Sequence, residues 1–214
     1  MITSRFLLQC LLCSLTVNGL IAGPNLAPAY TGSESGVPIE TYRPSPHPEP
    51  FDGPYFSIFG GYLSPDGGVD GYKDNVDHGG GGGVEFGWAF GLAPSTSLML
   101  EVELLGAGFN VDSGPAVGVG AFMNNVMIRR QVGRFGVYGG AGLGFYAVEV
   151  EDGYSLNGET DASGFAWQAL VGVDVEVASF MDVFLEYRYL SLEDTIKGDP
   201  LRQHLVGAGL RFKW

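Results

Sequence analysis

Cysteine and positive charge are both scarce in this chain, and each scarcity removes a class of protein. The two cysteines, Cys10 and Cys13, lie in an N-terminal segment that is expected to be cleaved. A mature chain without cysteine has neither a disulfide framework nor a cysteine metal site. Eleven Lys and Arg residues stand against 24 Asp and Glu residues, a formal net charge of −13. Nucleic acid is therefore excluded as a partner, because no basic stripe is available to meet phosphates.

Long apolar runs and catalytic motifs are also missing. Beyond residue 24 no segment approaches 18 uninterrupted apolar residues, which excludes a transmembrane helix there. The run Gly79–Gly83 leads into the strand-like residues 84–86, without the Lys-Ser/Thr pair of a phosphate loop. We expect it to be a flexible loop end entering a strand. The histidines His47, His78 and His204 are scattered, so the sequence predicts no catalytic residue, metal or cofactor.

The first 50 residues divide into two segments. Arg5 precedes the apolar run 6–15 and smaller residues up to Gly23, the order of a secretory signal peptide over residues 1–23. A membrane anchor helix is the alternative, although the apolar run is shorter than the ~20 residues that a span needs. Residues 24–50 hold seven of the 12 prolines, which favours a disordered periplasmic linker of extended geometry. The remaining residues, 51–214, form the third domain.

Period-two alternation dominates that third domain. In the second run, Val84, Phe86 and Trp88 share one face of a strand, while Glu85 and Gly87 share the other. One apolar face is long and unbroken, whereas the opposite faces hold Gly, Glu and Arg, the reverse of a soluble sandwich. We count eight such runs, over residues 54–63, 82–93, 96–109, 116–131, 135–149, 163–177, 181–192 and 203–214. In the fourth run the pattern is ambiguous, and we place Phe122, Val126 and Ile128 outward.

Strand and connection lengths indicate a membrane barrel. Ten residues at ~3.3 Å rise, tilted by ~45°, span roughly 23 Å, close to the ~25 Å apolar band of outer-membrane barrels. Short connections near residues 93–95, 132–134 and 178–180 alternate with longer polar ones, the pattern of periplasmic turns and outer loops. The last run ends in alternating apolar residues up to Trp214, as expected of a strand that closes a cylinder. The sequence therefore predicts an all-β fold, an eight-stranded antiparallel up-and-down transmembrane β-barrel preceded by a signal peptide and a Pro-rich tether.

Three segments carry a family resemblance: Val137–Phe145, Leu185–Tyr189 and Val206–Phe212. Over residues 53–214 the chain resembles the small eight-stranded outer-membrane barrels of the OmpA transmembrane-domain and opacity-protein type. The resemblance implies location in the bacterial outer membrane and recognition of the last strand by the barrel-assembly machinery. One departure is Trp214, because Phe is the usual final residue of that signal. A wall-tethering role is not implied, because no peptidoglycan-binding domain follows.

The resemblance also implies a salt-bridge network inside the barrel, with Glu186 and Arg211 as members. Charges that face the lumen can pair, whereas Arg or Lys facing lipid near the midplane costs ~2–4 kcal/mol. The expected network consists of Glu101, Glu103, Asp174, Glu176, Glu186, Arg188, Arg211 and Lys213, with Glu85 on the same face. Because carboxylates outnumber bases there, some must be protonated, lie near a rim, or pair with Arg129 or Arg130. The network either plugs the lumen or gates a narrow channel.

Outward aromatic residues and acidic loops complete the predicted surface. An aromatic girdle is expected at Trp88, Phe90, Trp167, Tyr187, Tyr189, Phe212 and Trp214. Acidic residues of the expected outer loops are Asp66, Asp70, Asp74, Asp77, Glu151 and Asp152. These loops are either simply solvated or bind divalent cations that bridge them to lipopolysaccharide phosphates, since hard oxygen ligands suit Ca²⁺.

Three functions remain open at this stage. The first is a non-enzymatic, monomeric outer-membrane protein with a structural or surface-interaction role, in contact with outer-membrane lipid and lipopolysaccharide. The second is a narrow pore for ions or small solutes. The third is a lipid A-modifying enzyme, in which Ser191 and His204 near the outer rim would act together.

Overall fold

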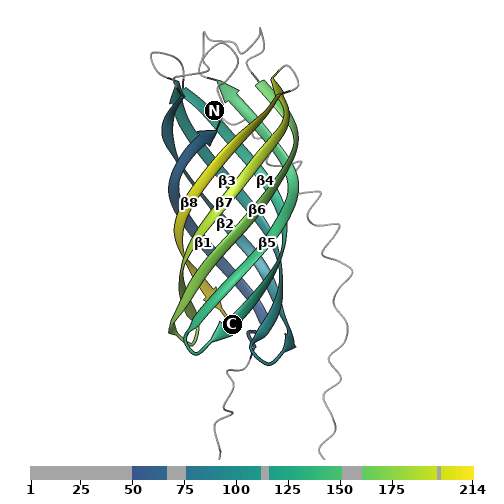
Figure 1. The fold of residues 1–214 in the computed structure, drawn as a ribbon, viewed down its shortest axis with the longest axis vertical. Coiled ribbons are helices and arrows are strands. Elements are labelled where there is room, and N and C mark those ends of the chain that lie inside the picture. The colour runs from purple at the N-terminus through teal and green to yellow at the C-terminus, as the bar shows by residue number, and fades with distance from the viewer. Residues whose placement is uncertain (1–49, 67–75, 112–115, 151–160, 197–198) are drawn as a thin grey trace, which may run out of the picture. The chain divides into compact units, whose positions relative to one another are not determined.

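The computed structural model describes residues 50–66, 76–111, 116–150, 161–196 and 199–214. Within these ranges the chain forms eight antiparallel strands, each hydrogen-bonded to its neighbours in sequence, and the first also pairs with the last (Figure 1). The strands are β1 (Gly53–Asp66), β2 (Val76–Ala93), β3 (Thr96–Val111), β4 (Ala116–Val132), β5 (Phe135–Val150), β6 (Asp161–Ala178), β7 (Met181–Ile196) and β8 (Asp199–Lys213). The predicted closed eight-stranded barrel is confirmed. The signal peptide and the Pro-rich linker were predicted for residues 1–50, nearly all outside the described ranges.

The stagger between neighbouring strands gives the closed barrel a defined shear number. The register followed from Phe56 through all eight strands returns to β1 at Asp66, ten residues further along. A shear of ten on eight strands corresponds to a strand tilt of about 40°. Closure pairs every strand on both sides, which is the condition for crossing lipid with strands. No helix among the described residues is long and apolar enough to span a membrane.

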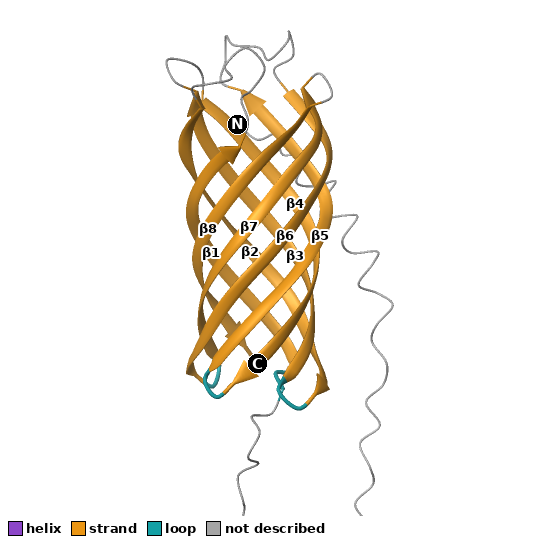
Figure 2. Cartoon of the chain, viewed as in Figure 1, coloured by secondary structure: helices purple, strands orange, loops and turns teal. Residues whose placement is uncertain are grey.

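The two ends of the barrel differ. Three tight turns, at residues 94–95, 133–134 and 179–180, lie at the end that also holds the C-terminus (Figure 2). Ser95 and Gly133 adopt positive φ angles of 67° and 63° there, the left-handed conformation that two-residue hairpin turns use. The other four connections join the strands at the opposite end. Three of these four connections are longer than the tight turns, residues 67–75, 112–115 and 151–160, whereas only residues 197–198 join β7 to β8. Because short turns are periplasmic and longer connections extracellular in barrels of this kind, we assign this end to the outside of the cell.

The strands run further toward the outer end than predicted. Strand β2 begins at Val76, so Gly79–Gly83 lies within a strand, and the expectation of a flexible loop end was wrong. These glycines pair with β1 on one side and β3 on the other, so backbone hydrogen bonds hold them without side chains. Asp66 and Asp77, expected in a loop, likewise belong to β1 and β2.

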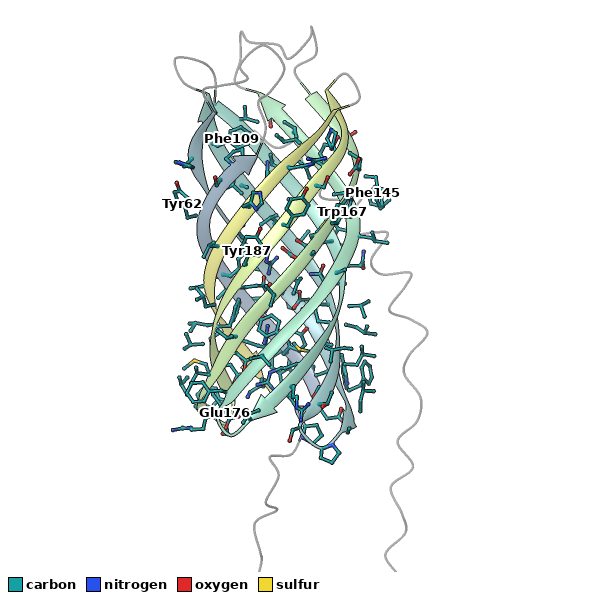
Figure 3. All side chains as sticks on the ribbon, viewed as in Figure 1. Tyr62, Phe109, Phe145, Trp167, Glu176 and Tyr187 are labelled. Carbon is teal, nitrogen blue, oxygen red and sulfur yellow. The ribbon has the colours of Figure 1, made fainter. Side chains whose placement is uncertain are left out.

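Apolar side chains face outward around the barrel, as the alternation predicted. Tyr62 and Phe145 project from the wall in Figure 3. Exposed outward residues from seven strands are Ile58, Phe86, Val126, Leu143, Val171, Leu185 and Val206. Phe122 shares the outward register but is only 9% exposed, and its register partners Leu104 and Phe145 flank it. A wall with this many exposed apolar groups is suited to lipid and not to water.

Toward the outer end, the apolar belt on β2, β3 and β4 gives way to glycine. After Val84, Leu104 and Phe122 the next outward positions are Gly82, Gly106 and Gly120, which pair with one another across the strands. A Cβ atom added to Gly106 or Gly120 would meet no atom within 4 Å, so both face open space. Strand β2 has 18 residues, a reach of about 45 Å at this tilt against a belt of ~25 Å. The wall therefore extends beyond the membrane on the outer side.

Candidate functional site

The interior of the barrel is filled with side chains arranged in layers. The layer nearest the outer end is mostly apolar, because nearly all inward positions of the strands there are hydrophobic, although it also encloses the buried side chain of Gln203 on β8. Leu63 on β1, Phe109 on β3 and Leu192 on β7 are each at most 3% exposed, and Figure 3 shows Phe109 at this end. Further members of this apolar layer are Leu105, Val117, Val119, Tyr146, Val148, Leu190, Leu201 and Leu205. An eight-stranded barrel is just wide enough for such filling.

A single guanidinium group occupies the centre of the interior. Arg188 on β7 forms ion pairs with Glu85 on β2, Glu103 on β3 and Glu186 on its own strand. All four side chains are at most 4% exposed. The ring of Phe59 lies 4.1 Å from the Arg188 Cζ atom, so the cation also rests on an aromatic face. Three carboxylates thus hold one cation from strands on different sides of the barrel.

Neutral donors hold the neighbouring carboxylates. The Tyr55 hydroxyl donates to Glu101 Oε2 at 3.1 Å, and Asn125 Nδ2 donates to Glu101 Oε1 at 2.9 Å. Asn125 also donates to Glu103 Oε2 at 2.8 Å, and Gln168 Nε2 donates to the same oxygen at 2.7 Å. Both oxygens of Glu101 therefore accept hydrogen bonds. Glu103 has no unused oxygen either, because its other oxygen binds Arg188.

Arg211 lies below this cluster among aromatic rings. Its Cζ atom is 5.0 to 5.2 Å from the ring centres of Tyr55, Tyr138 and Phe184. Its Nη1 atom is 3.5 Å from Asp174 Oδ2, while its Nε and Nη2 atoms have no hydrogen-bond partner among the described residues. Three aromatic faces and one carboxylate therefore surround this buried cation.

Two glycines make room for those rings. A Cβ atom on Gly87 would overlap the Tyr55 ring, and one on Gly172 would overlap the Tyr138 ring. Both glycines face inward on the strands next to these tyrosines, and each is a register partner of the tyrosine concerned. Glycine at these positions is therefore required for packing.

The periplasmic end of the interior carries a second ion-pair cluster. Arg129 binds Asp174 through two hydrogen bonds, Nε to Oδ2 at 2.8 Å and Nη2 to Oδ1 at 2.6 Å. Lys213 Nζ lies 2.6 Å from Asp182 Oδ1 and 3.2 Å from Glu176 Oε2. Of these groups Glu176 is the most exposed, consistent with its place at the lower end in Figure 3.

All eight residues of the expected charge network face the interior, but in two clusters. Glu101, Glu103, Glu186 and Arg188 belong to the central cluster, with Arg211 beneath it. The other three, Asp174, Glu176 and Lys213, belong to the periplasmic cluster.

Further members of the two clusters that were not placed in the network from the sequence are Tyr55, Asn125, Gln131, Gln168 and Asp182. Of the two arginines offered as additional partners, Arg129 is buried against Asp174 and Arg130 is exposed. The pairs Asn124-Asn125 and Arg129-Arg130 place a polar residue on each face of β4, and this hid which one points inward. Asn125 and Arg129 lie at period-two spacing from the inward residues Met123 and Met127, and this spacing could have identified them as the inward members of the two pairs.

The expected girdle residues face outward at two levels. Trp88, Phe90, Phe212 and Trp214 lie near the periplasmic ends of β2 and β8. The other three, Trp167, Tyr187 and Tyr189, lie on β6 and β7, and Figure 3 shows Trp167 in the outer half of the barrel and Tyr187 near its mid-height.

A hydrogen-bonded group surrounds the outer aromatic residues. The Tyr187 hydroxyl lies 2.6 Å from His204 Nδ1, and the rings of Tyr189 and His204 meet edge to face at 5.3 Å. Trp167 Nε1 and Ser191 Oγ both donate to Glu193 Oε1 at 2.9 Å. The Ser191 hydroxyl is thus directed to a carboxylate and His204 to a phenol. The geometry does not support the pair of Ser191 and His204 expected for a lipid-modifying enzyme.

The expected cation-binding loops fall mostly outside the described residues. This applies to Asp70, Asp74, Glu151 and Asp152, and the structure gives only the strand positions of Asp66 and Asp77. The register places Asp66 opposite Arg202 on β8.

Comparison with known proteins supports the architecture. Residues 45–212 match the sequence family described as outer membrane protein beta-barrel domain. The solved structure of Neisserial surface protein A (NspA) is similar with a TM-score of 0.58 and 14% identity, over 75% of this chain and 97% of that one. Ail of Yersinia pestis has a TM-score of 0.43 at 18% identity, over 76% and 100% of the two chains. OprG of Pseudomonas aeruginosa has 0.40 at 14%, over 77% and 99%. No curated protein sequence matches the chain significantly. At these identities the likeness to NspA concerns the fold alone.

Proposed function

Because the chain belongs to the outer membrane protein beta-barrel domain family, we propose that it is a non-enzymatic barrel of the bacterial outer membrane that acts through its outer surface. Its location in that membrane follows from the family. The proposed part is the role: a structural or surface-interaction protein, monomeric, whose acidic extracellular connections meet lipopolysaccharide or another surface partner.

The filled interior is the observation that carries this proposal. An ion entering from outside would have to displace the side chains of Leu63, Leu105 and Leu205, each at most 6% exposed. Moving an unpaired charge into an apolar layer is strongly unfavourable. The ion pairs of Arg188 and Arg129 would then have to open in turn. In a barrel filled in this way, the surfaces available for binding are the outer wall and the two ends.

Acidic residues in the outer connections suggest how contact is made. Residues 67–75 include Asp70 and Asp74, and residues 151–160 include Glu151 and Asp152. Divalent cations held by these carboxylates would bridge them to the phosphates of lipopolysaccharide. The girdle residues would position the barrel in the lipid, and the barrel-assembly machinery would insert it by recognising β8.

Binding of purified lipopolysaccharide to the detergent-solubilised protein tests this role. We expect binding with Ca²⁺ that is lost with EDTA, and lost in the variant Asp70→Asn, Asp74→Asn, Glu151→Gln, Asp152→Asn. A matched control removes two carboxylates at the periplasmic end, Asp52→Asn and Glu176→Gln, and should bind as the wild type does. Equal binding by all three proteins, or none with Ca²⁺ present, would contradict the proposed role of the loops.

A narrow pore is the alternative function, and one observation favours it. Below the apolar layer, polar groups occupy two levels of the interior, the Arg188 cluster with Gln168 and the Lys213 cluster at the periplasmic rim, and Arg211 links the two past the apolar residues Met99, Met127 and Leu170. Exchange of partners by Arg188 could open part of this path. A pore predicts measurable conductance, whereas a filled barrel predicts none.

A lipid A-modifying enzyme has less support, since Ser191 donates to Glu193 and not to His204. Mass spectrometry of lipid A from cells with and without the gene decides it, and identical species would exclude it.

A further inference from the structure

Four aromatic side chains lie in contact across three neighbouring strands on the outside of the barrel. Trp167 on β6 packs against Tyr189 on β7 with ring centres 5.4 Å apart, and Tyr189 meets His204 on β8 at 5.3 Å. The ring of Tyr187 lies 5.9 Å from that of His204. These four rings, called the aromatic row below, form one continuous surface on the outward face of β6, β7 and β8.

The aromatic row lies where the lipid-facing wall ends. On its periplasmic side the outward residues include Val171, Leu185 and Val206, with 57%, 53% and 49% of their surfaces exposed. On its outer side β7 continues with the half-buried Glu193, and β8 carries the exposed Arg202. A belt of ~25 Å measured from the periplasmic turns ends at about this height. A molecule on the row would thus have hydrocarbon on one side and polar groups on the other.

The polar atoms of two of these rings bond to the protein itself. The Tyr187 hydroxyl and His204 Nδ1 share a hydrogen bond of 2.6 Å, and Trp167 Nε1 donates to Glu193 Oε1 at 2.9 Å. Interfacial tyrosine and tryptophan that serve only as anchors direct these atoms toward water and head groups. Here the internal hydrogen bonds fix the rings and leave their faces as the contact surface. A surface fixed in this way loses little conformational entropy when it binds.

The aromatic row is confined to one side of the barrel. On β2, β3 and β4, which lie across the ring of strands from it, the outward positions toward the outer end are Gly82, Gly106 and Gly120. A Cβ atom on Gly106 or Gly120 would meet no atom within 4 Å. A belt that only anchors the barrel would surround it, whereas this surface has the extent of a local site.

Ring faces below and planar polar groups above suit a sugar that carries acyl chains. The face of an aromatic ring is negative and attracts the polarised C–H groups on the face of a sugar ring. Hydroxyl and phosphate oxygens of the sugar would point to the outer side, where the guanidinium group of Arg202 can donate paired hydrogen bonds. The acyl chains would extend along Leu185 and Val206. A phospholipid head group without a ring has nothing to stack.

From these observations we propose that the aromatic row and Arg202 bind the phosphorylated sugar head group of one lipopolysaccharide molecule in the outer leaflet. This inference rests on the proposed contact with lipopolysaccharide and assigns the lipid end of that molecule to the wall of the barrel. The acidic loops act through Ca²⁺ on lipopolysaccharide that arrives from solution. The aromatic row acts on lipid already concentrated beside the barrel in the membrane, where a weak contact needs no bridging cation.

Tryptophan fluorescence tests the site, because the chain has three tryptophans and only Trp167 belongs to the row. The full-length variant Trp88→Phe, Trp214→Phe keeps Trp167 as the single reporter. It is placed in phosphatidylcholine nanodiscs with a rising fraction of lipid A, in EDTA so that the loops hold no cation. We expect a saturable change in Trp167 emission with lipid A, and none with phosphatidylglycerol, which is anionic but has no sugar ring.

Variants in this single-tryptophan background locate the contact. Tyr189→Ala and Arg202→Gln should each raise the lipid A fraction at half-saturation several-fold. Arg130→Gln, which removes an exposed arginine on β4, should leave it unchanged. The separate variant Trp167→Phe, Trp214→Phe, which keeps Trp88 near the periplasmic end, should show no saturable change.

The outcomes separate this site from the loops. The four-residue loop variant used for lipopolysaccharide binding should keep the Trp167 response, so failure of the loop proposal and failure of this one are distinguishable. Absence of a saturable response to lipid A would overturn the site. An equal response to phosphatidylglycerol would also overturn it and leave the aromatic row as a membrane anchor.

Discussion

Arg188 on β7 and Glu103 on β3 form a buried ion pair across the barrel, although 85 residues separate them in the chain. Their strands are not neighbours in the ring, so the contact crosses the interior and does not run along the sheet. The pair forms where β3 and β7 face each other across the interior of the closed cylinder. Its stability therefore reports on the completed barrel.

Removing this guanidinium group should destabilise the barrel strongly. Arg188→Gln leaves three buried carboxylates without their common partner, and breaking a buried pair from one side typically costs ~3–5 kcal/mol. We expect a loss of this size in the free energy of unfolding, measured by urea titration in detergent with heat-dependent gel migration. The double variant Arg188→Gln, Glu103→Gln should lose less than the two single variants together. Arg130→Gln, which removes an exposed charge, should change the stability little.

Glycine at position 87 should not tolerate even a methyl group. A Cβ atom there would lie 2.6 Å from Tyr55 Cε1 and overlap the rest of the ring, so the tyrosine that holds Glu101 must move. Overpacking of this kind costs roughly 1–3 kcal/mol. Gly106→Ala is the matched control, because its methyl group meets nothing within 4 Å and should be nearly neutral. Equal stabilities of the two variants in the same urea titration would show that the interior is not packed as described.

The depth of a residue in the lipid belt should decide the cost of a charge there. Val171 on β6 is 57% exposed in the middle of the apolar face, and Val171→Arg should destabilise the barrel by ~2–4 kcal/mol in lipid vesicles. Phe180 is similarly exposed, at 58%, but lies in a periplasmic turn, and Phe180→Arg should cost only ~0–1 kcal/mol. If Phe180→Arg destabilised the barrel more than Val171→Arg does, the membrane would lie elsewhere on the barrel.

Alternation was enough to predict the fold and the direction of most side chains. Trp88 and Glu85 were assigned to opposite faces correctly because strand period two leaves only two choices. The level of a residue within the barrel was not predictable in the same way. It depends on the stagger between strands, and nothing local in the sequence shows that the register gains ten residues around the ring.

The charged interior shows this limit most clearly. From the sequence, Asp174 and Glu186 belonged to one inward set, but the structure separates them into a periplasmic pair with Arg129 and a central pair with Arg188. The run Gly79–Gly83 was misjudged for a different reason. Glycine has low intrinsic preference for strands, and only hydrogen bonds from both neighbouring strands hold it there.

Single-channel recording in planar bilayers tests the central claim, that the interior is filled and the barrel acts through its outer surface. The purified wild-type protein, folded as judged by heat-dependent gel migration, should insert into the bilayer and show no steady open-channel current at any holding potential. A steady conductance that Glu101→Gln or Arg211→Gln abolishes would contradict the account and establish the pore.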